Sequence, residues 1–172
     1  MRRLLLDGLV HRPLTERPPF PADEALAELT QTLARATRRR LGRSLSIRVV
    51  DAGSCNACEL ELNALGNAFY DLERFGIRIV ASPRHADVLI VTGPVSRNMA
   101  EALRRTHEAM PGPKWVVAVG GCAIDGGWFV GSPAVLGGAG KVLPVDLHIP
   151  GCPPSPMAIM RGLIALLDRA SA

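Results

Sequence analysis

Short apolar segments alternate with helical segments from residue 45 to the end of this 172-residue chain, and this alternation constrains the fold most. Apolar runs predict strands at 47–50, 77–81, 88–92, 115–119 and 142–149. Helices are predicted between them, from a turn at 53–56 to about Leu72, from an N-cap at Ser96 to Met110, and from Ser155 onward. Strands that alternate with helices form a mainly parallel sheet covered on both faces. We therefore predict an α/β fold.

The first 44 residues have a different pattern. Four prolines interrupt residues 1–22 and block regular structure there. Asp23 offers an N-cap for a helix to about Arg40, with Gly42 as its end. Leu26, Leu29 and Leu33 fall on one face of this helix, through which we expect it to pack. We predict a basic N-terminal extension with one helix at 1–44 and a single domain at 45–172.

The net charge of +4 comes from the N-terminal part of the chain. Residues 1–50 carry ten Lys or Arg and five Asp or Glu, whereas the remainder carries ten and eleven. Aromatic residues make up only 4%, and no nucleic-acid-binding motif is present, so we expect no nucleic-acid partner. No apolar stretch approaches the ~20 residues of a membrane span, and the apolar run at 4–6 is too short for an export signal. We therefore place the chain in the cytoplasm.

Cysteines follow three of the predicted strands. Cys55 and Cys58 follow the strand at 47–50, Cys122 follows 115–119, and Cys152 follows 142–149. Loops at the carboxyl ends of parallel strands gather at one edge of the sheet, where ligands bind. Four thiols that are far apart in sequence are therefore expected to converge there, each in a loop flanked by glycine or proline.

Four interpretations of these thiols compete. They could be small core hydrophobes, or Cys55 and Cys58 could form a thioredoxin-like dithiol that leaves the other two without a role. Four cysteines could also bind zinc, but structural zinc sites use compact pairs, whereas 63 residues separate Cys58 from Cys122. An iron–sulfur cluster accepts four thiolates from scattered loops, and we favour one [4Fe–4S] cluster.

Several motifs resemble the 20 kDa subunit family of complex I, which includes the small subunits of energy-converting [NiFe] hydrogenases and formate hydrogenlyase. The motifs are DAGSCNACE at 51–59, VTGPVSRNM at 91–99, GGC at 120–122 and IPGCPPSP at 149–156. The resemblance spans roughly residues 46–167. It implies a flavodoxin-like core with a single [4Fe–4S] cluster, whose ligands would be Cys55, Cys58, Cys122 and Cys152. The spacing of Cys55 and Cys58 is similar to the hydrogenase branch, since complex I members typically present two adjacent cysteines.

The resemblance implies electron transfer within an oxidoreductase complex, with no catalysis by this chain alone. The expected partners are a hydrogenase-type large subunit, other iron–sulfur subunits and membrane subunits that hold the chain on the cytoplasmic face of the inner membrane. One alternative is a complex I type subunit that passes electrons to quinone. A second alternative is a structural subunit that binds zinc.

Three other side chains and one loop complete the candidates. Glu59 and Glu61 flank the first cysteine motif, where a proton route competes with the more ordinary solvated or capping carboxylate. His148 could couple a proton to the site, although a hydrogen-bonded structural histidine is the better expectation. The loop at 125–140 contains Trp-Phe-Val at 128–130, and we interpret it as an interface that covers the cluster, although it could equally fold back onto its own core.

Overall fold

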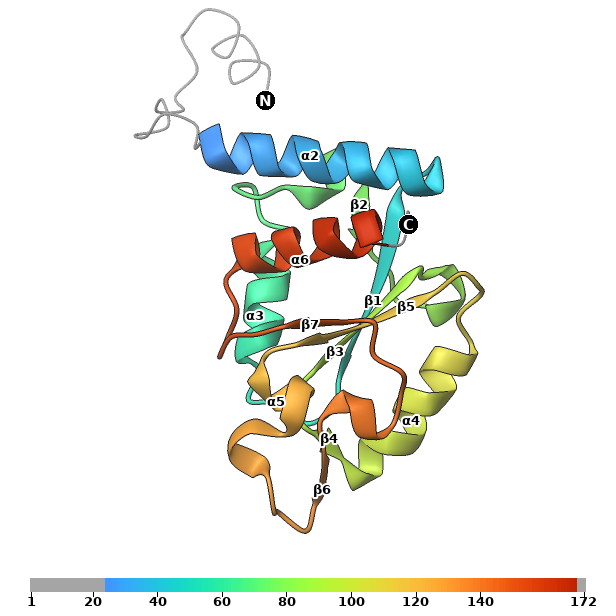
Figure 1. The fold of residues 1–172 in the computed structure, drawn as a ribbon, viewed down its shortest axis with the longest axis vertical. Coiled ribbons are helices and arrows are strands. Elements are labelled where there is room, and N and C mark those ends of the chain that lie inside the picture. Colours follow the sequence, from blue (N-terminus) through green and yellow to red (C-terminus); the bar gives the residue numbers. More distant parts are fainter. Residues whose placement is uncertain (1–23, 170–172) are drawn as a thin grey trace, which may run out of the picture.

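A computed structural model describes residues 24–169 of the chain, which contain a five-stranded parallel sheet (Figure 1). Its strands are β1 (Leu45–Asp51), β2 (Ile77–Ile79), β3 (Val88–Thr92), β5 (Trp115–Val119) and β7 (Leu147–Ile149). They lie in the order β2-β1-β3-β5-β7, and all neighbours pair in parallel. This is the 2-1-3-4-5 order of flavodoxin-like sheets, which confirms the predicted fold class.

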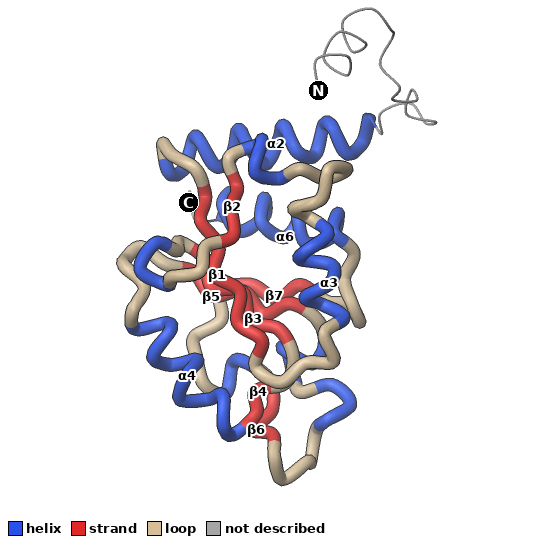
Figure 2. The backbone as a smooth tube through the Cα atoms, turned by 180° about the vertical axis from the view of Figure 1, so that it is seen from behind, coloured by secondary structure: helices blue, strands red, loops and turns tan. Residues whose placement is uncertain are grey.

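Helices cover the two faces of the sheet unequally. Helices α2 (Glu24–Leu41), α3 (Ala57–Ala64) and α6 (Pro156–Arg169) contribute to the core on one face. On the other face lie α4 (Arg97–Glu108) and the short α5 (Gly121–Asp125), as the rear view shows (Figure 2). Two-residue β4 (Val95–Ser96) pairs antiparallel with β6 (Val135–Gly137) beyond the sheet. Among residues 24–169 no helix is both long and apolar enough to cross a membrane.

Short 3-10 turns complete the connections between these elements. They are η1 (Leu72–Phe75), η2 (Pro83–His85), η3 (Gly127–Phe129) and η4 (Ala139–Lys141). Turn η2 is the whole of the regular structure between β2 and β3, so no helix crosses over at that point of the fold.

The central strand β3 explains why the sheet has two cores. All five of its residues are buried. Val88 and Ile90 join the core beneath α2, α3 and α6, whereas Leu89 and Val91 join the core beneath α4. Successive side chains of a strand point to opposite faces, so a continuous apolar run is suited to a strand that is covered on both sides.

The predicted N-terminal helix is confirmed and packs through its leucines. Leu26 and Leu33 of α2 share a core with α6, and Arg39 forms an ion pair of 2.6 Å with Asp168. Gly42 follows the helix with a φ of 65° and donates its N–H to the carbonyl of Arg38. The predicted N-cap Asp23 and the irregular segment at 1–22 lie outside the described residues.

The helix predicted to run to about Leu72 is wrong, because α3 ends at Ala64. The side-chain Oδ1 of Asn67 accepts the N–H groups of Phe69 and Tyr70, at 2.8 and 3.0 Å, and so stabilises a turn instead. Phe69, which helical spacing placed on the buried face, is 63% exposed. Leu72 is buried, but it lies in η1.

Two predicted strands are shorter than expected, and the glycine-rich loop is more regular. Strand β2 ends at Ile79, and residues 142–146 of the predicted last strand are not in β7. Asp146 precedes β7 and donates its N–H to the carbonyl of Val116 at 2.8 Å, while its carboxylate accepts the N–H of Val116 at 2.7 Å, so a side chain supplies one of the two bonds to β5 at this point. The loop at 125–140 contains η3 and β6.

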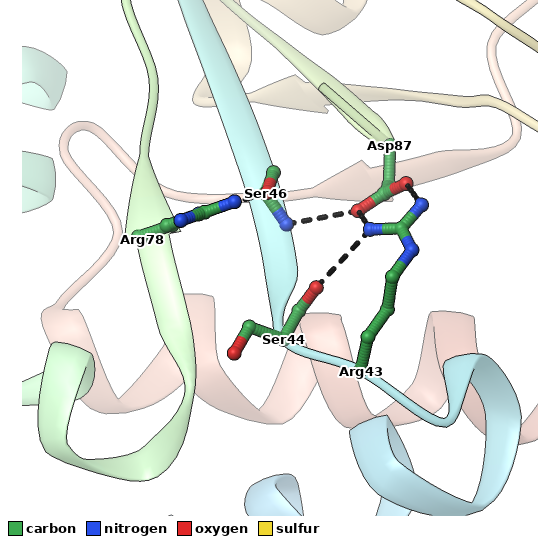
Figure 3. Close-up of polar contacts among 5 residues, drawn as sticks. All are labelled: Arg43, Ser44, Ser46, Arg78 and Asp87. Atoms are coloured by element: carbon green, nitrogen blue, oxygen red, sulfur yellow. Dashed lines mark hydrogen bonds and ion pairs between the residues drawn. The ribbon is translucent and has the colours of Figure 1, made fainter. Parts of the chain in front are cut away.

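A buried carboxylate joins α2, β1 and β3 at the end of the sheet opposite the cysteines. The side chain of Asp87 is 4% exposed and receives both terminal nitrogens of Arg43, at 2.9 and 2.5 Å (Figure 3). Its Oδ2 also accepts the backbone N–H of Ser46 at 2.9 Å. The carboxylate raises the pKa of the Arg43 guanidinium through their hydrogen bond and charge attraction.

We predict that Asp87→Ala lowers the free energy of unfolding by about 2–3 kcal/mol, because the buried N–H of Ser46 loses its acceptor and Arg43 loses its partner. The figure allows for solvent screening of the half-exposed Arg43. Urea denaturation monitored by circular dichroism measures the change. Glu101→Gln is the control, since Glu101 pairs with Arg104 and Arg105 only at the exposed surface of α4. Equal midpoints for the two variants would contradict the role of Asp87.

Candidate metal centre

The structure brings the three cysteine-bearing loops to one edge of the sheet. They follow the carboxyl ends of β1, β5 and β7, which share a direction because the strands are parallel (Figure 1). Backbone hydrogen bonds of 2.9 Å join the second and third loops, from Gly120 N to Ile149 O and from Gly121 N to Gly151 O. The loops that hold Cys122 and Cys152 are therefore fixed to each other through their main chains.

The first cysteine loop is shaped by side-chain bonds to its own backbone. Oδ1 of Asp51, the last residue of β1, accepts the N–H groups of Gly53 and Ser54 at 2.8 and 2.6 Å. The Ser54 hydroxyl accepts the N–H of Asn56, which has a left-handed φ of 70°. Helix α3 begins at the next residue, so its first turn carries Cys58.

Glu59 ties this loop to the end of β3. One carboxylate oxygen accepts the hydroxyl of Ser54 at 2.7 Å, and the other accepts the hydroxyl of the fully buried Thr92. Glu59 is thus an internal anchor of the site. Sequence reasoning missed Thr92, whose only signal was its place as the last residue of a buried strand at the same edge.

The remaining polar candidates take less part in the site. Glu61 is half-buried on α3 and forms no ion pair with another described residue. His148 is exposed on the edge strand β7, and within residues 24–169 its side chain makes no hydrogen bond, so it is not the hydrogen-bonded structural histidine that we expected.

Two of the thiols lie directly against the main chain of glycine residues. A Cβ atom added to Gly120 would lie 2.6 Å from Sγ of Cys58, and one added to Gly127 would lie 2.7 Å from Sγ of Cys122. Both glycines have positive φ, of 90° and 52°. Any side chain at these positions would displace a sulfur atom, so the two glycines let the backbone approach the thiols closely.

The other thiols face outward. Cys55 and Cys152 are exposed, whereas Cys58 and Cys122 are partly buried. Cys122 and Cys152 share a cleft of about 350 Å³, which is also lined by Gly121, Asp125, Gly127 and Trp128. Thiols from two different loops therefore open onto one space at the surface of the molecule.

The four thiols lie within electrostatic range of one another. The pKa of the Cys58 thiol is raised to about 11, mainly by burial, with smaller contributions from the charges of Glu59 and of the other three cysteines. Burial also raises the pKa of Cys122, against the lowering effect of a hydrogen bond from the backbone N–H of Trp128, and Cys152 and Cys55 add to the rise. Four thiolates would repel one another here, so their joint ionisation requires a cationic group between them.

The four cysteines restrict which cationic group could bind between them. Within residues 24–169 no three His, Cys, Asp or Glu side chains are gathered closely enough to hold one metal ion. A tetrahedral zinc site needs all its sulfurs about 2.3 Å from a single ion. A cubane cluster instead offers a separate iron atom to each cysteine and so suits sulfurs that are further apart. Four cysteine thiols on three separate loops are a donor set that fits such a cluster.

Large apolar side chains stand beside the cleft without cover. Trp128 is 91% exposed, and the neighbouring Phe129 and Val130 are also exposed. We call residues 128–130 the apolar patch. The patch does not fold back onto the core of its own chain, and exposed apolar surface of this kind is typical of protein interfaces.

Comparisons with known proteins agree on one family. Residues 55–166 match the family described as the NADH ubiquinone oxidoreductase 20 kDa subunit. The "Probable membrane-bound hydrogenase subunit mbhJ" of Pyrococcus furiosus is 43% identical over 129 residues, which are 75% of this chain and 77% of that protein. Formate hydrogenlyase subunit 7 of Escherichia coli K12 is 41% identical over 149 residues, 87% of this chain but only 57% of that longer protein.

A solved structure is similar as well. A chain of the membrane-bound sulfane sulfur reductase, an archaeal respiratory membrane complex, superimposes with a TM-score of 0.66 at 36% identity. The match covers 79% of this chain and 74% of the other.

We predict that Gly120→Ala abolishes metal binding, because the new Cβ atom displaces Cys58 and the positive φ adds roughly 1–3 kcal/mol of strain. Gly121→Ala is the matched control, since a Cβ atom at Gly121 meets nothing closer than a carbonyl oxygen 3.9 Å away. Iron in the two purified variants is measured by elemental analysis, with circular dichroism to confirm folding. Equal iron contents would contradict the close contact between Gly120 and Cys58.

Proposed function

The chain belongs to the family of the NADH ubiquinone oxidoreductase 20 kDa subunit, and from this premise we propose that it is the electron-transfer subunit of a membrane-bound hydrogenase or formate hydrogenlyase type complex. The observation that carries the proposal is the arrangement of Cys55, Cys58, Cys122 and Cys152 on three loops at one edge of the parallel sheet. These four cysteines would hold one [4Fe–4S] cluster. When bound, such a cluster takes up and gives back one electron.

The residues around the thiols would tune the site. Partial burial of Cys58 lowers the local dielectric, which disfavours added negative charge and so shifts a reduction potential downward. The backbone N–H of Trp128 points at the sulfur of Cys122 and has the opposite effect. Glu59 holds the first cysteine loop through Ser54 and Thr92, which keeps the thiols in place during electron transfer.

The hydrogenase branch is supported by two observations. Relatives of 43% and 41% identity are named as hydrogenase and formate hydrogenlyase subunits. The two cysteines of the first loop are separated by Asn56 and Ala57, the spacing that is similar to this branch. The large partner subunit would carry the [NiFe] site, and this chain alone would perform no catalysis.

Partner subunits would hold the chain at the membrane. The relatives and the similar structure belong, by their names, to membrane-bound or formate hydrogenlyase complexes. We propose that the chain lies peripherally on the cytoplasmic face of the inner membrane. The apolar patch beside the cleft would contact the large subunit and shield the site from water.

The family description favours a second candidate, a quinone-linked complex of the complex I type. This chain would have the same electron-transfer role there, and only the electron acceptor would differ. Nickel in the partner subunit therefore distinguishes the two candidates.

The test is iron, acid-labile sulfide and nickel analysis of the native complex, purified anaerobically through a tag on this chain. We expect Cys122→Ala to lose about four iron and four sulfide per complex, the content of one cubane cluster. Ser132→Ala, a substitution in the exposed loop at 125–140, serves as the control and is expected to retain them.

Each outcome has a distinct meaning. Nickel in the wild-type complex supports the hydrogenase type, and iron and sulfide without nickel support the quinone-linked type. Full iron content after Cys122→Ala would refute the ligand assignment. Zinc without sulfide would refute electron transfer by this chain.

We predict further that Trp128→Ala lowers recovery of the large subunit with the tagged chain about tenfold or more, as expected for a buried tryptophan at the centre of an interface. Phe69→Ala is the control, because Phe69 is also an exposed aromatic residue but lies in the turn after α3. Quantitative mass spectrometry of the captured complex gives the ratio of subunits. Unchanged recovery would show that the apolar patch is not the large-subunit contact.

A further inference from the structure

One face of the sheet lacks a covering helix over β1 and β2. The connection from β2 to β3 is made through η2, where a doubly wound fold ordinarily has a crossover helix. Helices α2, α3 and α6 serve the other face, and α4 contributes its core residues beneath β3 and β5. Val50 of β1 joins the core beneath α4, whereas within the described residues no α-helix lies over the part of this face formed by the start of β1 and by β2 (Figure 2).

Two arginines and one serine occupy this part of the face, where Ser46 is fully buried, Arg48 is half-buried and Arg78 is exposed. Ser46 and Arg48 of β1 share it because they are two residues apart, and Arg78 of β2 is paired in register with Ser46. The Nε of Arg78 donates to the Ser46 hydroxyl at 3.2 Å, which confirms that both side chains lie on the same side (Figure 3). We call Ser46, Arg48 and Arg78 the basic face.

The charges of the basic face are not neutralised within the described chain. Asp87, the carboxylate next to it, is already occupied by Arg43. Among residues 24–169 Arg78 has only the neutral hydroxyl of Ser46 as its partner. The Nε of Arg48 is buried and has no hydrogen-bond partner in the same range. A half-buried guanidinium without an acceptor is unfavourable, and because Nε itself is closed to solvent, an acceptor from outside the chain would have to bind the terminal nitrogens of Arg48.

We infer that the basic face is a docking surface for an acidic segment of a neighbouring protein subunit. Carboxylates fit the guanidinium group with two parallel hydrogen bonds, and arginine is enriched where proteins meet. Arg78 is exposed and Arg48 is half-buried, so a protruding Asp or Glu side chain would approach both from the solvent side. A membrane surface instead attracts protruding, flexible basic side chains. This inference rests on the proposed membership of a multisubunit complex, and it adds a contact at a different face from the apolar patch.

Charge reversal tests the inference in the native complex. We expect R48E/R78E to lower about tenfold or more the recovery of one neighbouring subunit at moderate salt, because attraction becomes repulsion. R104E/R105E makes the same charge change on α4 and is the matched control. Iron and sulfide of the R48E/R78E chain are measured in parallel, and we expect them to equal those of the wild type. Absence of iron from the wild type would refute the cluster, whereas recovery equal to the control would refute only the docking surface.

A second variant preserves the charge in case charge reversal impairs folding. R48K/R78K supplies amines at the same positions, and carbodiimide joins an amine to a carboxylate only where the two are in contact. We expect cross-links from position 48 or 78 to Asp or Glu of another subunit, identified by peptide mass spectrometry. Cross-links at R104K but none at 48 or 78 would overturn the inference. Loss of bound phospholipid from R48E/R78E, with full retention of every subunit, would overturn it in favour of a lipid contact.

Discussion

Parallel pairing of the strands is the constraint on which the rest of the structure depends. Five parallel strands all end at the same edge, so loops separated by many residues in sequence become neighbours there. The side chains of Asp51 and Glu59 shape the first loop, and main-chain bonds from Gly120 and Gly121 join the other two. The sheet thus places the three cysteine loops side by side, and short polar contacts fix the local conformation of each loop.

The site is costly for the chain to build without a ligand. Cys58 has a raised pKa because it is partly buried and faces other thiols, so the protonated form is favoured when nothing is bound. Below the ordinary thiol pKa of 9.0 this preference favours the folded state, and the contribution is lost as pH rises through about 11. In the proposed cluster, iron would replace the protons by positive charge, which would remove the repulsion between thiolates. The same arrangement that disfavours free thiolates therefore suits a cationic cluster.

The parts of the fold that were predictable are those in which local and tertiary signals agree. Strand β3 was predictable because a continuous apolar run suits a strand that is buried on both faces. Helix α4 was predictable because Ser96 is an N-cap residue, and its hydroxyl accepts the N–H of Met99 at 3.3 Å. The end of α3 was not readable, since the apolar spacing continued to Phe69 while the Asn67 side chain offered the backbone a competing turn. Thr92 entered the site through a contact with Glu59, and no periodicity predicts such a contact.

The two faces of the sheet differ because one crossover lacks a helix. Where α3 and α6 cover the sheet, apolar residues such as Ile47 and Ile77 are buried in a core. Where η2 stands in place of a helix, the same two strands present Ser46, Arg48 and Arg78. An isolated subunit would gain stability from apolar side chains beneath a helix at this position. In the proposed docking surface, a neighbouring subunit would supply the layer that helices supply elsewhere, and its carboxylates would pair with the two arginines.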